Sequence, residues 1–147
     1  MADVFTHFNY LHTIPEIGMK EFKTSAYVAD VLKQLGYEVE TQVGRATGVV
    51  AVCDSGKPGA VLGLRADMDA LGTKDGGAAH LCGHDGHMAM LLAAAEEIMK
   101  EKLVRKGKLK LLFQPAEETS EGALSMLKGG AVDDIEILIG MHGRPIQ

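Results

Sequence analysis

Two long segments of the chain carry hydrophobic residues with the period of an α-helix. In the first, they recur at i, i+3, i+4 and i+7, Thr24 or Ser25 can cap the start, and Gly36 suits the left-handed position after a helix. A longer helix is predicted to begin at His84 or Asp85 and to end in a run of mostly cationic residues. The predicted buried faces comprise Val28, Val31, Leu32 and Leu35 in the first helix, and Met88, Leu91, Leu92, Ala95, Ile98 and Met99 in the second.

Shorter apolar or alternating runs around these helices predict five strands. The turn residues 55–59 separate two of them and favour a hairpin between these two strands. Residues 65–79, which include Gly72, Gly76 and Gly77, are typical of a loop. The predicted strands are 37–43, 47–53, 60–64, 109–113 and 135–140, and two further short helices are predicted at 3–12 and 120–127.

The second half of the chain alternates strand, loop, helix, strand, loop, helix and strand. This order predicts the α/β class, with a mostly parallel sheet flanked by helices. In such sheets ligands bind beyond the carboxyl ends of the strands. Three segments with metal-binding or acid–base side chains follow strands in this way, so we expect them to meet at one edge of the sheet. They are residues 80–87, Glu117 with Glu118, and His142.

The composition narrows the class of protein and its partners. A chain of 147 residues is expected to form a single domain and can bury one hydrophobic core. A net charge of −5, no Trp and only 5% aromatic residues argue against nucleic acid and anionic membranes as partners. The first four residues carry no basic region and lead into no apolar run, so no signal peptide is expected. No run approaches the roughly 20 apolar residues of a membrane span. These features favour the cytoplasm, where Cys53 and Cys82 would be thiols.

Residues 80–87 concentrate groups that bind metals or transfer protons, because they include three of the chain's six histidines, one of its two cysteines and an aspartate. Cys82 and His84 are good ligands for zinc and similar divalent ions, and a helix N-terminus favours the thiolate. Asp85 and His87 can hydrogen-bond such ligands and fix their tautomers. The alternative is a helix cap with solvent-facing histidines, which explains one histidine more easily than the whole cluster.

Carboxylates and one further histidine follow the neighbouring strands. Glu117 and Glu118 can divide two roles, one binding metal while the other takes a proton from water. A solvated acidic turn is the alternative for this pair. His142 ends an apolar strand, and Asp67 and Asp69 follow another, so each is a candidate ligand or supporting group, or else an ordinary surface residue. The residues interpreted as structural or surface residues are His7, His12 and Cys53.

Several motifs in this order resemble the M20 family of metallopeptidases. They resemble more closely its amidohydrolase branch, which cleaves N-acyl amino acids, auxin conjugates and related amides. The match covers nearly the whole chain, and the metal-site motifs are specific. The motifs are Arg65-Ala66-Asp67-Met68-Asp69-Ala70-Leu71, His80-x-Cys82-Gly83-His84-Asp85-Gly86-His87, Gln114-Pro115-Ala116-Glu117-Glu118 and Gly140-Met141-His142, with Leu11-His12-x-x-Pro15-Glu16-x-Gly18 and Thr24-Ser25 before them.

This resemblance implies a zinc-exopeptidase-like catalytic domain that holds two divalent metal ions, which would be zinc, manganese or cobalt. Cys82 would bridge the ions, His84, Glu118 and His142 would be the further ligands, and Glu117 would be the general base. The ions would share a water and polarise an amide carbonyl, and Glu117 would pass the proton to the leaving amine. The implied partner is a small N-acyl amino acid or peptide substrate. No nucleic acid or membrane partner is implied, and a homo-oligomer is an open alternative.

Three hypotheses for the function stay open. In the leading one, residues 1–147 form the N-terminal part of an amidohydrolase catalytic domain, without the lid and dimerisation domain and without the C-terminal segment that supplies one more histidine ligand. The second is a truncated metal-binding or interaction module without turnover. The third makes Cys82 a nucleophile with His84 or His87 as its base, although a thiol hydrolase needs neither the glutamate pair nor the last histidine. The loop 71–79 is shorter than this family usually shows.

Overall fold

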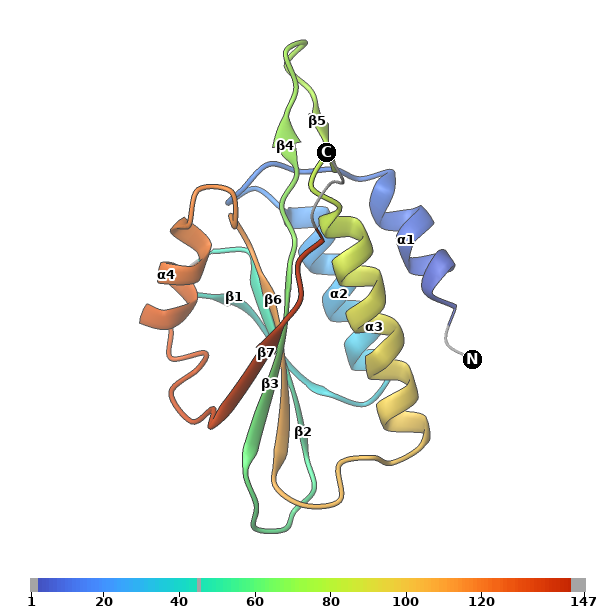
Figure 1. The fold of residues 1–147 in the computed structure, drawn as a ribbon, viewed down its shortest axis with the longest axis vertical. Coiled ribbons are helices and arrows are strands. Elements are labelled where there is room, and N and C mark those ends of the chain that lie inside the picture. The colour runs from blue at the N-terminus through green and yellow to red at the C-terminus, as the bar shows by residue number, and fades with distance from the viewer. Residues whose placement is uncertain (1–2, 45, 144–147) are drawn as a thin grey trace.

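The computed structural model describes residues 3–44 and 46–143, which form a five-stranded sheet with helices on both faces (Figure 1). The strands lie in the order β1-β2-β6-β3-β7, and a small hairpin, β4-β5, projects from one end of the molecule. The predicted α/β class is confirmed. The elements are α1 (Val4–His12), α2 (Phe22–Gln34), β1 (Glu38–Val43), β2 (Gly48–Asp54), β3 (Val61–Asp67), β4 (Leu71–Gly72), β5 (Ala78–Ala79), α3 (His84–Lys100), β6 (Lys108–Gln114), α4 (Glu121–Lys128) and β7 (Ile137–Gly140).

The two halves of the sheet pair differently. β1 with β2 and β2 with β6 are antiparallel, whereas β6 with β3 and β3 with β7 are parallel. The parallel pairs belong to the second half of the chain, where the alternation of strands and helices predicted them. There α3 connects β3 to β6, and α4 connects β6 to β7. The carboxyl ends of β3, β6 and β7 therefore meet at one edge of the sheet.

The predicted hairpin between the strands now seen as β2 and β3 is wrong, because β6 lies between them. The turn residues 55–59 reverse the chain, but a turn does not decide which strand becomes the neighbour. Leu109, Leu111, Leu112 and Phe113 of β6 are at most 4% exposed. Placing this strand at the centre of the sheet removes its apolar side chains from water on both faces, which is the larger driving force.

Two hydrophobic cores cover the faces of the sheet. The larger core packs α1, α2 and α3 against one face and includes Leu11, Leu32, Met88 and Phe113, all fully buried. Every residue predicted for the buried faces of α2 and α3 lies in this core or against it, so those predictions are confirmed. The smaller core lies on the α4 side of the sheet and comprises Val43, Val50, Leu112, Met126 and Ala131.

The start of α2 differs from the predicted cap at Thr24 or Ser25. The helix begins at Phe22, and both of those residues are buried within it. Glu16 supplies the missing acceptors, since its carboxylate accepts hydrogen bonds from the backbone N–H groups of Lys23 at 3.1 Å and Thr24 at 2.9 Å. The prediction considered only residues next to the helix, so it did not identify the capping carboxylate of Glu16, which comes from the preceding loop.

Residues 65–79, predicted as loop, are partly extended. β3 continues to Asp67, and residues 71–72 pair with 78–79 in a short antiparallel hairpin. The turn of this hairpin is rich in glycine, which is why the composition indicated a loop. The longer β3 places Asp67 level with Gln114 at the end of β6.

β7 is an edge strand whose apolar side chains remain exposed. Ile137, Leu138 and Ile139 are 49–56% exposed, and Met141 beyond the strand is 67% exposed. Ile139 and Met141 also line a shallow apolar pocket beside α3. Apolar exposure of this extent is typical of an interaction surface.

Neither stretch of the described chain, residues 3–44 or 46–143, contains a helix long and apolar enough to span a bilayer. Cys53 and Cys82 are free thiols, as predicted. Cys53 packs from β2 against the larger core. Met1 and Ala2, on which the expectation about a signal peptide partly rests, lie outside the described residues.

Candidate metal centre

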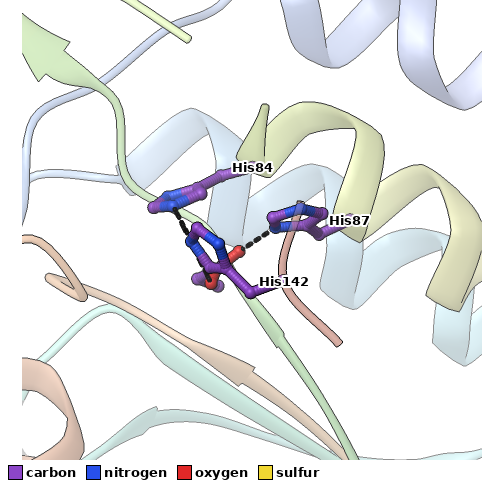
Figure 2. A group of neighbouring side chains, drawn as sticks. His84, His87 and His142 are labelled. Atoms are coloured by element: carbon purple, nitrogen blue, oxygen red, sulfur yellow. Dashed lines mark hydrogen bonds and ion pairs between the residues drawn. The ribbon is translucent and has the colours of Figure 1, made fainter. Parts of the chain in front are cut away.

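The carboxyl ends of β3, β6 and β7 bring the predicted site segments together. Asp67 ends β3, the glutamate pair follows β6, and His142 follows β7. The helix α3 begins at the same edge, so that His84 and His87 come from its first turn. Figure 2 shows the imidazole rings of these three histidines converging from α3 and from the segment after β7.

His84 and His142 face each other through ring nitrogens that both lack a hydrogen in the neutral side chains. The Nδ1 atom of His84 lies 2.8 Å from the Asp69 carbonyl oxygen, and Nδ1 of His142 lies 2.6 Å from the Gly143 carbonyl oxygen. A carbonyl oxygen only accepts, so each Nδ1 carries the hydrogen and each Nε2 is an acceptor. The two Nε2 atoms are nevertheless only 3.2 Å apart, with Asp67 Oδ2 within 3.8 Å of both. This arrangement is stable only if a proton or a metal cation lies between them.

Two groups of ligand-capable side chains overlap at His84, and within each group the donor atoms lie within 4.8 Å of one another. They combine imidazole, thiolate and carboxylate donors, the set that zinc and similar divalent ions prefer. The residues therefore fit such ions. All four predicted ligands are among them, and Asp67, predicted as a candidate ligand or supporting group, lies in the same cluster. The groups are Asp67, His84, His87 and His142, and Cys82, His84 and Glu118.

His87 has both ring nitrogens engaged by the protein. Its Nδ1 lies 2.6 Å from Asp67 Oδ1, and its Nε2 accepts a hydrogen bond from the Gly143 backbone N–H at 2.8 Å. Because Nε2 accepts, Nδ1 carries the hydrogen and donates it to Asp67. Contacts of this kind fix a side chain beside metal ligands, and the supporting role that the sequence suggested for His87 stays a prediction.

Asp67 is fully buried beside Arg65, whose Nη1 donates to Asp67 Oδ2 at 2.7 Å. The same guanidinium donates from Nε and Nη2 to Gln114 Oε1, at 2.9 and 2.7 Å. Arg65 thus joins the ends of β3 and β6. The sequence motif included Arg65, but its role was not predicted, because a strand pattern does not show which neighbour a long side chain reaches.

Asp69 holds both His84 and the glutamate pair. Its carboxylate oxygens accept the backbone N–H groups of Glu117 at 3.0 Å and Glu118 at 3.2 Å. Burial by itself raises the pKa of Asp69, but the hydrogen bonds from His84 and the two amides hold that pKa below its ordinary 3.8. For His84 burial acts in the opposite direction and lowers the pKa. The hydrogen bond to Asp69 and the charges of Asp67 and Asp69 outweigh burial, so that the pKa of His84 lies above its ordinary 6.5.

Cys82 lies beside the glutamate pair. Its hydrogen bond with Glu118, its burial and the negative charges of Glu118, Glu117 and Asp67 raise the pKa of the thiol to about 11. Without a cation the group is therefore a thiol at neutral pH rather than a thiolate. A bound cation reverses this balance, because it stabilises the thiolate directly.

Asp85 is turned away from the ligand atoms. Its Oδ2 lies 2.6 Å from His12 Nδ1, which links α3 to α1, and its Oδ1 accepts the backbone N–H of Gly86. His12, interpreted from the sequence as structural or surface, is this partner. The other early histidine, His7, is buried and contacts Tyr27 and Glu96, in agreement with a structural role.

Two buried polar groups near the site had no predicted role. Both ring nitrogens of His80 are buried without a hydrogen-bond partner among the described residues. Glu21 is fully buried and accepts the backbone N–H of Ala116 at 2.8 Å. The only sequence signal for Glu21 was a charged residue at the start of an amphipathic helix, which is ordinarily exposed.

The chain is similar in sequence to a known protein family and to several enzymes. Residues 63–146 match the family model for Peptidase family M20/M25/M40. The chain is 41% identical to thermostable carboxypeptidase 1 of Saccharolobus solfataricus, over 90% of this chain and 37% of that protein. It is 38% identical to the N-acetyl-L-cysteine deacetylase of Bacillus subtilis, over 92% of this chain and 35% of that protein. The chain thus spans little more than a third of the length of these relatives.

Solved structures give the same picture. A Bacillus subtilis protein described as a dinuclear metal-binding peptidase of the M20 family superposes with a TM-score of 0.88. It shares 30% sequence identity, over 97% of this chain and 42% of that chain. The match covers the sheet, the helices and the edge where the candidate ligands gather.

Proposed function

Because the chain belongs to Peptidase family M20/M25/M40, we propose that it forms the metal-binding part of an amidohydrolase. The proposed reaction is hydrolysis of the amide bond in N-acyl amino acids or small peptides. The relatives support this substrate class, since their names describe a carboxypeptidase, an N-acetyl-L-cysteine deacetylase and a hippurate hydrolase. The chain corresponds in this proposal to the N-terminal part of one catalytic domain.

The proposed ligands are Cys82, His84, Glu118 and His142, with Asp67 beside them. Two divalent ions, when bound, lower the pKa of a water molecule and polarise the carbonyl of the amide. The protein itself fixes the donors before a metal binds. The Nδ1 atom of His84 contacts the Asp69 carbonyl oxygen, and the Nδ1 atom of His142 contacts the Gly143 carbonyl oxygen. Donors held in this way lose little freedom on binding, which favours affinity.

Glu117 is the proposed general base. Its Oε2 lies 3.7 Å from His84 Nε2, and its side chain is 32% exposed, so it reaches both the ligand cluster and solvent. The backbone N–H of Glu117 is fixed by Asp69. Held there, the carboxylate takes a proton from the attacking water and delivers it to the nitrogen of the leaving amine.

The observation that carries the proposal is the contact between the Nε2 atoms of His84 and His142. Both are acceptors 3.2 Å apart, beside the carboxylate of Asp67 and the thiol group of Cys82. A proton alone satisfies one such pair, whereas divalent cations would use the donors of both groups, which share His84.

The test combines metal content with turnover on the same sample. The chain is loaded with Zn²⁺, Mn²⁺ or Co²⁺, its metal stoichiometry is measured by elemental analysis, and hydrolysis of N-acetyl amino acids is followed. Bound metal with turnover that is lost on chelation and restored by the ions is the expected result. Bound metal without turnover would support the alternative, a catalytically incomplete metal-binding module. A chain that binds no metal would contradict the centre itself.

The two free cysteines of this chain allow a matched comparison of metal content. Cys82→Ala is expected to lower metal content, whereas Cys53→Ala, which alters a strand residue away from the cluster, leaves it unchanged. The hypothesis of a cysteine nucleophile is disfavoured by the pKa of Cys82, raised to about 11, because nucleophilic cysteines have lowered pKa values.

A further inference from the structure

Glu21 is the buried carboxylate that the proposed mechanism leaves unused. It lies just before α2 but does not cap that helix, and it is fully buried. One carboxylate oxygen accepts the backbone N–H of Ala116 at 2.8 Å, and the other accepts the hydroxyl of Thr47. Both partners are neutral, so Glu21 contacts them as a hydrogen-bond acceptor and not as half of an ion pair. The contact with Ala116 fixes the position of that backbone amide.

The hydrogen bond from Ala116 to Glu21 restrains the segment that carries Glu117 and Glu118. Three successive backbone N–H groups of this segment donate hydrogen bonds to buried carboxylates. Ala116 donates to Glu21, and Glu117 and Glu118 donate to Asp69. Fixing three consecutive amides fixes the direction in which the two side chains leave the backbone. Asp69 and Glu21, which lie far apart in the sequence, therefore hold this segment together.

The backbone at Ala116 is in an unfavourable conformation that requires such support. Its φ angle is 45°, in the left-handed region, which is unfavourable for a residue other than glycine. The segment before Glu21 also approaches closely, because a Cβ at Gly18 would lie 3.0 Å from the Cα and Cβ atoms of Ala116. The close approach of Gly18 and the hydrogen bond from the Ala116 amide to Glu21 both restrain this left-handed turn.

We infer that Glu21 is a positioning residue, which through the Ala116 amide aims Glu117 and Glu118 at the metal-binding cluster. This inference rests on the proposed function. Residues that orient ligands from behind typically change metal affinity by about 10- to 100-fold when they are removed. Glu21 touches neither ligand atoms nor the base directly, so its effect passes through the backbone.

Side-chain chemistry suggests a pair of variants that separates positioning from simple stability. Glu21→Gln keeps an acceptor for the Ala116 amide, while its NH₂ group can donate to the Thr47 oxygen. Glu21→Met has a similar length but offers the amide no comparable acceptor. Thr47→Val removes the other partner of Glu21 and leaves the Ala116 contact in place, so it serves as the matched control.

The experiment titrates the whole chain with Co²⁺ well below the unfolding temperature of every variant and follows the visible absorption of the bound ion. We expect Glu21→Met to bind Co²⁺ about 10- to 100-fold more weakly with an altered spectrum. Glu21→Gln and Thr47→Val are expected to stay close to wild type. Unchanged Co²⁺ affinity and spectrum in Glu21→Met, whatever its thermal stability, would overturn the inference.

Hydrogen exchange of the Ala116, Glu117 and Glu118 amides separates this inference from the proposed function. If the wild-type chain binds no Co²⁺, the proposed metal centre fails, but the positioning can still be measured. Faster exchange of all three amides in Glu21→Met, with unchanged exchange in the strand β6, supports positioning. Exchange that rises equally in β6 and in these amides means a general loss of stability and overturns it.

Discussion

His87 donates its Nδ1 hydrogen to Asp67 across 2.6 Å, and on its other side accepts the backbone N–H of Gly143. This single imidazole ties the end of β3 to the segment that carries His142. Since Asp67 also pairs with Arg65, the buried carboxylate is the point where three strand ends are joined. Its charge should therefore matter for folding even without metal.

Replacing Asp67 with Asn tests this connection. The change leaves Arg65 without its counter-charge, and breaking a buried ion pair in this way costs about 3 kcal/mol, the low end of the usual range because Arg65 is 20% exposed. Urea unfolding of the metal-free protein measures the loss. The exposed Asp30→Asn on α2 is the control, expected within about 0.5 kcal/mol of wild type. Equal effects of the two variants would contradict the role of Asp67.

The contacts of Asp69 make the stability of the metal-free protein depend on pH. Its pKa is lowered on folding, so its contribution is present above 3.8 and is lost as pH falls through the folded value. The pKa of His84 is raised on folding, so its contribution is full below 6.5 and is lost as pH rises through the folded value. The free energy of unfolding should therefore differ most between wild type and Asp69→Asn between these two pH values. Urea titrations across that range check this, and a difference independent of pH would refute it.

The thiol of Cys82 should react slowly in the absence of metal. With a pKa of about 11, its thiolate fraction and its alkylation rate by iodoacetamide should rise about tenfold per pH unit well past neutrality. Glu118→Gln removes the charge and the strongest acceptor beside the thiol, so it should speed alkylation at a given pH. Peptide mass spectrometry follows Cys82 separately from Cys53. A rate that levels off at 9.0, the pKa of an ordinary thiol, would contradict the prediction.

Glu117 and Glu118 are adjacent, but substitutions at the two positions should have different effects on turnover and metal content. Glu117→Gln removes the proposed base and is expected to lower turnover by about 10²- to 10⁴-fold while metal content stays unchanged. Glu118→Gln removes a proposed ligand and should lower metal content first. Elemental analysis and an N-acetyl amino acid assay on both variants distinguish the two roles. Normal turnover in Glu117→Gln would remove it as the base.

Gly122, in the first turn of α4, should tolerate no side chain. A Cβ there would lie 1.6 Å from the Pro115 carbonyl oxygen, so Gly122→Ala must push apart α4 and the segment that carries the glutamate pair. We expect a loss of about 3 kcal/mol or more. Gly86→Ala in α3 is the matched control, because nothing lies within 4 Å of its Cβ, and it should be neutral or stabilising by up to about 1 kcal/mol. Urea unfolding compares the two.

The gathering of the site residues could be predicted because it depends on chain order. Asp67 ends a strand of the parallel half and Glu118 and His142 each follow one, and parallel strands present their carboxyl ends at one edge. Cys82 and His84 precede or begin the helix that packs over this edge. Their roles as ligands remain a proposal, and the cytoplasmic location remains a prediction.

Contacts between distant segments could not be predicted in the same way. The insertion of β6 between β2 and β3 depends on which strand buries the most apolar area, not on the turn that joins them. The carboxylates of Glu16 and Glu21 find backbone amides in other segments, and nothing near them in sequence identifies those amides. The direction of Asp85 toward His12, away from the cluster, likewise depends on how α1 packs against α3.

The place of β7 at the edge of the sheet sets an order of assembly while the chain is being synthesised. At about 5–20 residues per second, β3, α3 and β6 leave the ribosome before β7 does. A nascent chain can therefore bring Cys82, His84 and Glu118 together before His142 has emerged from the ribosome. Because β7 adds to the outside of β3 without separating strands already paired, His142 can join the other candidate ligands without a rearrangement of the sheet.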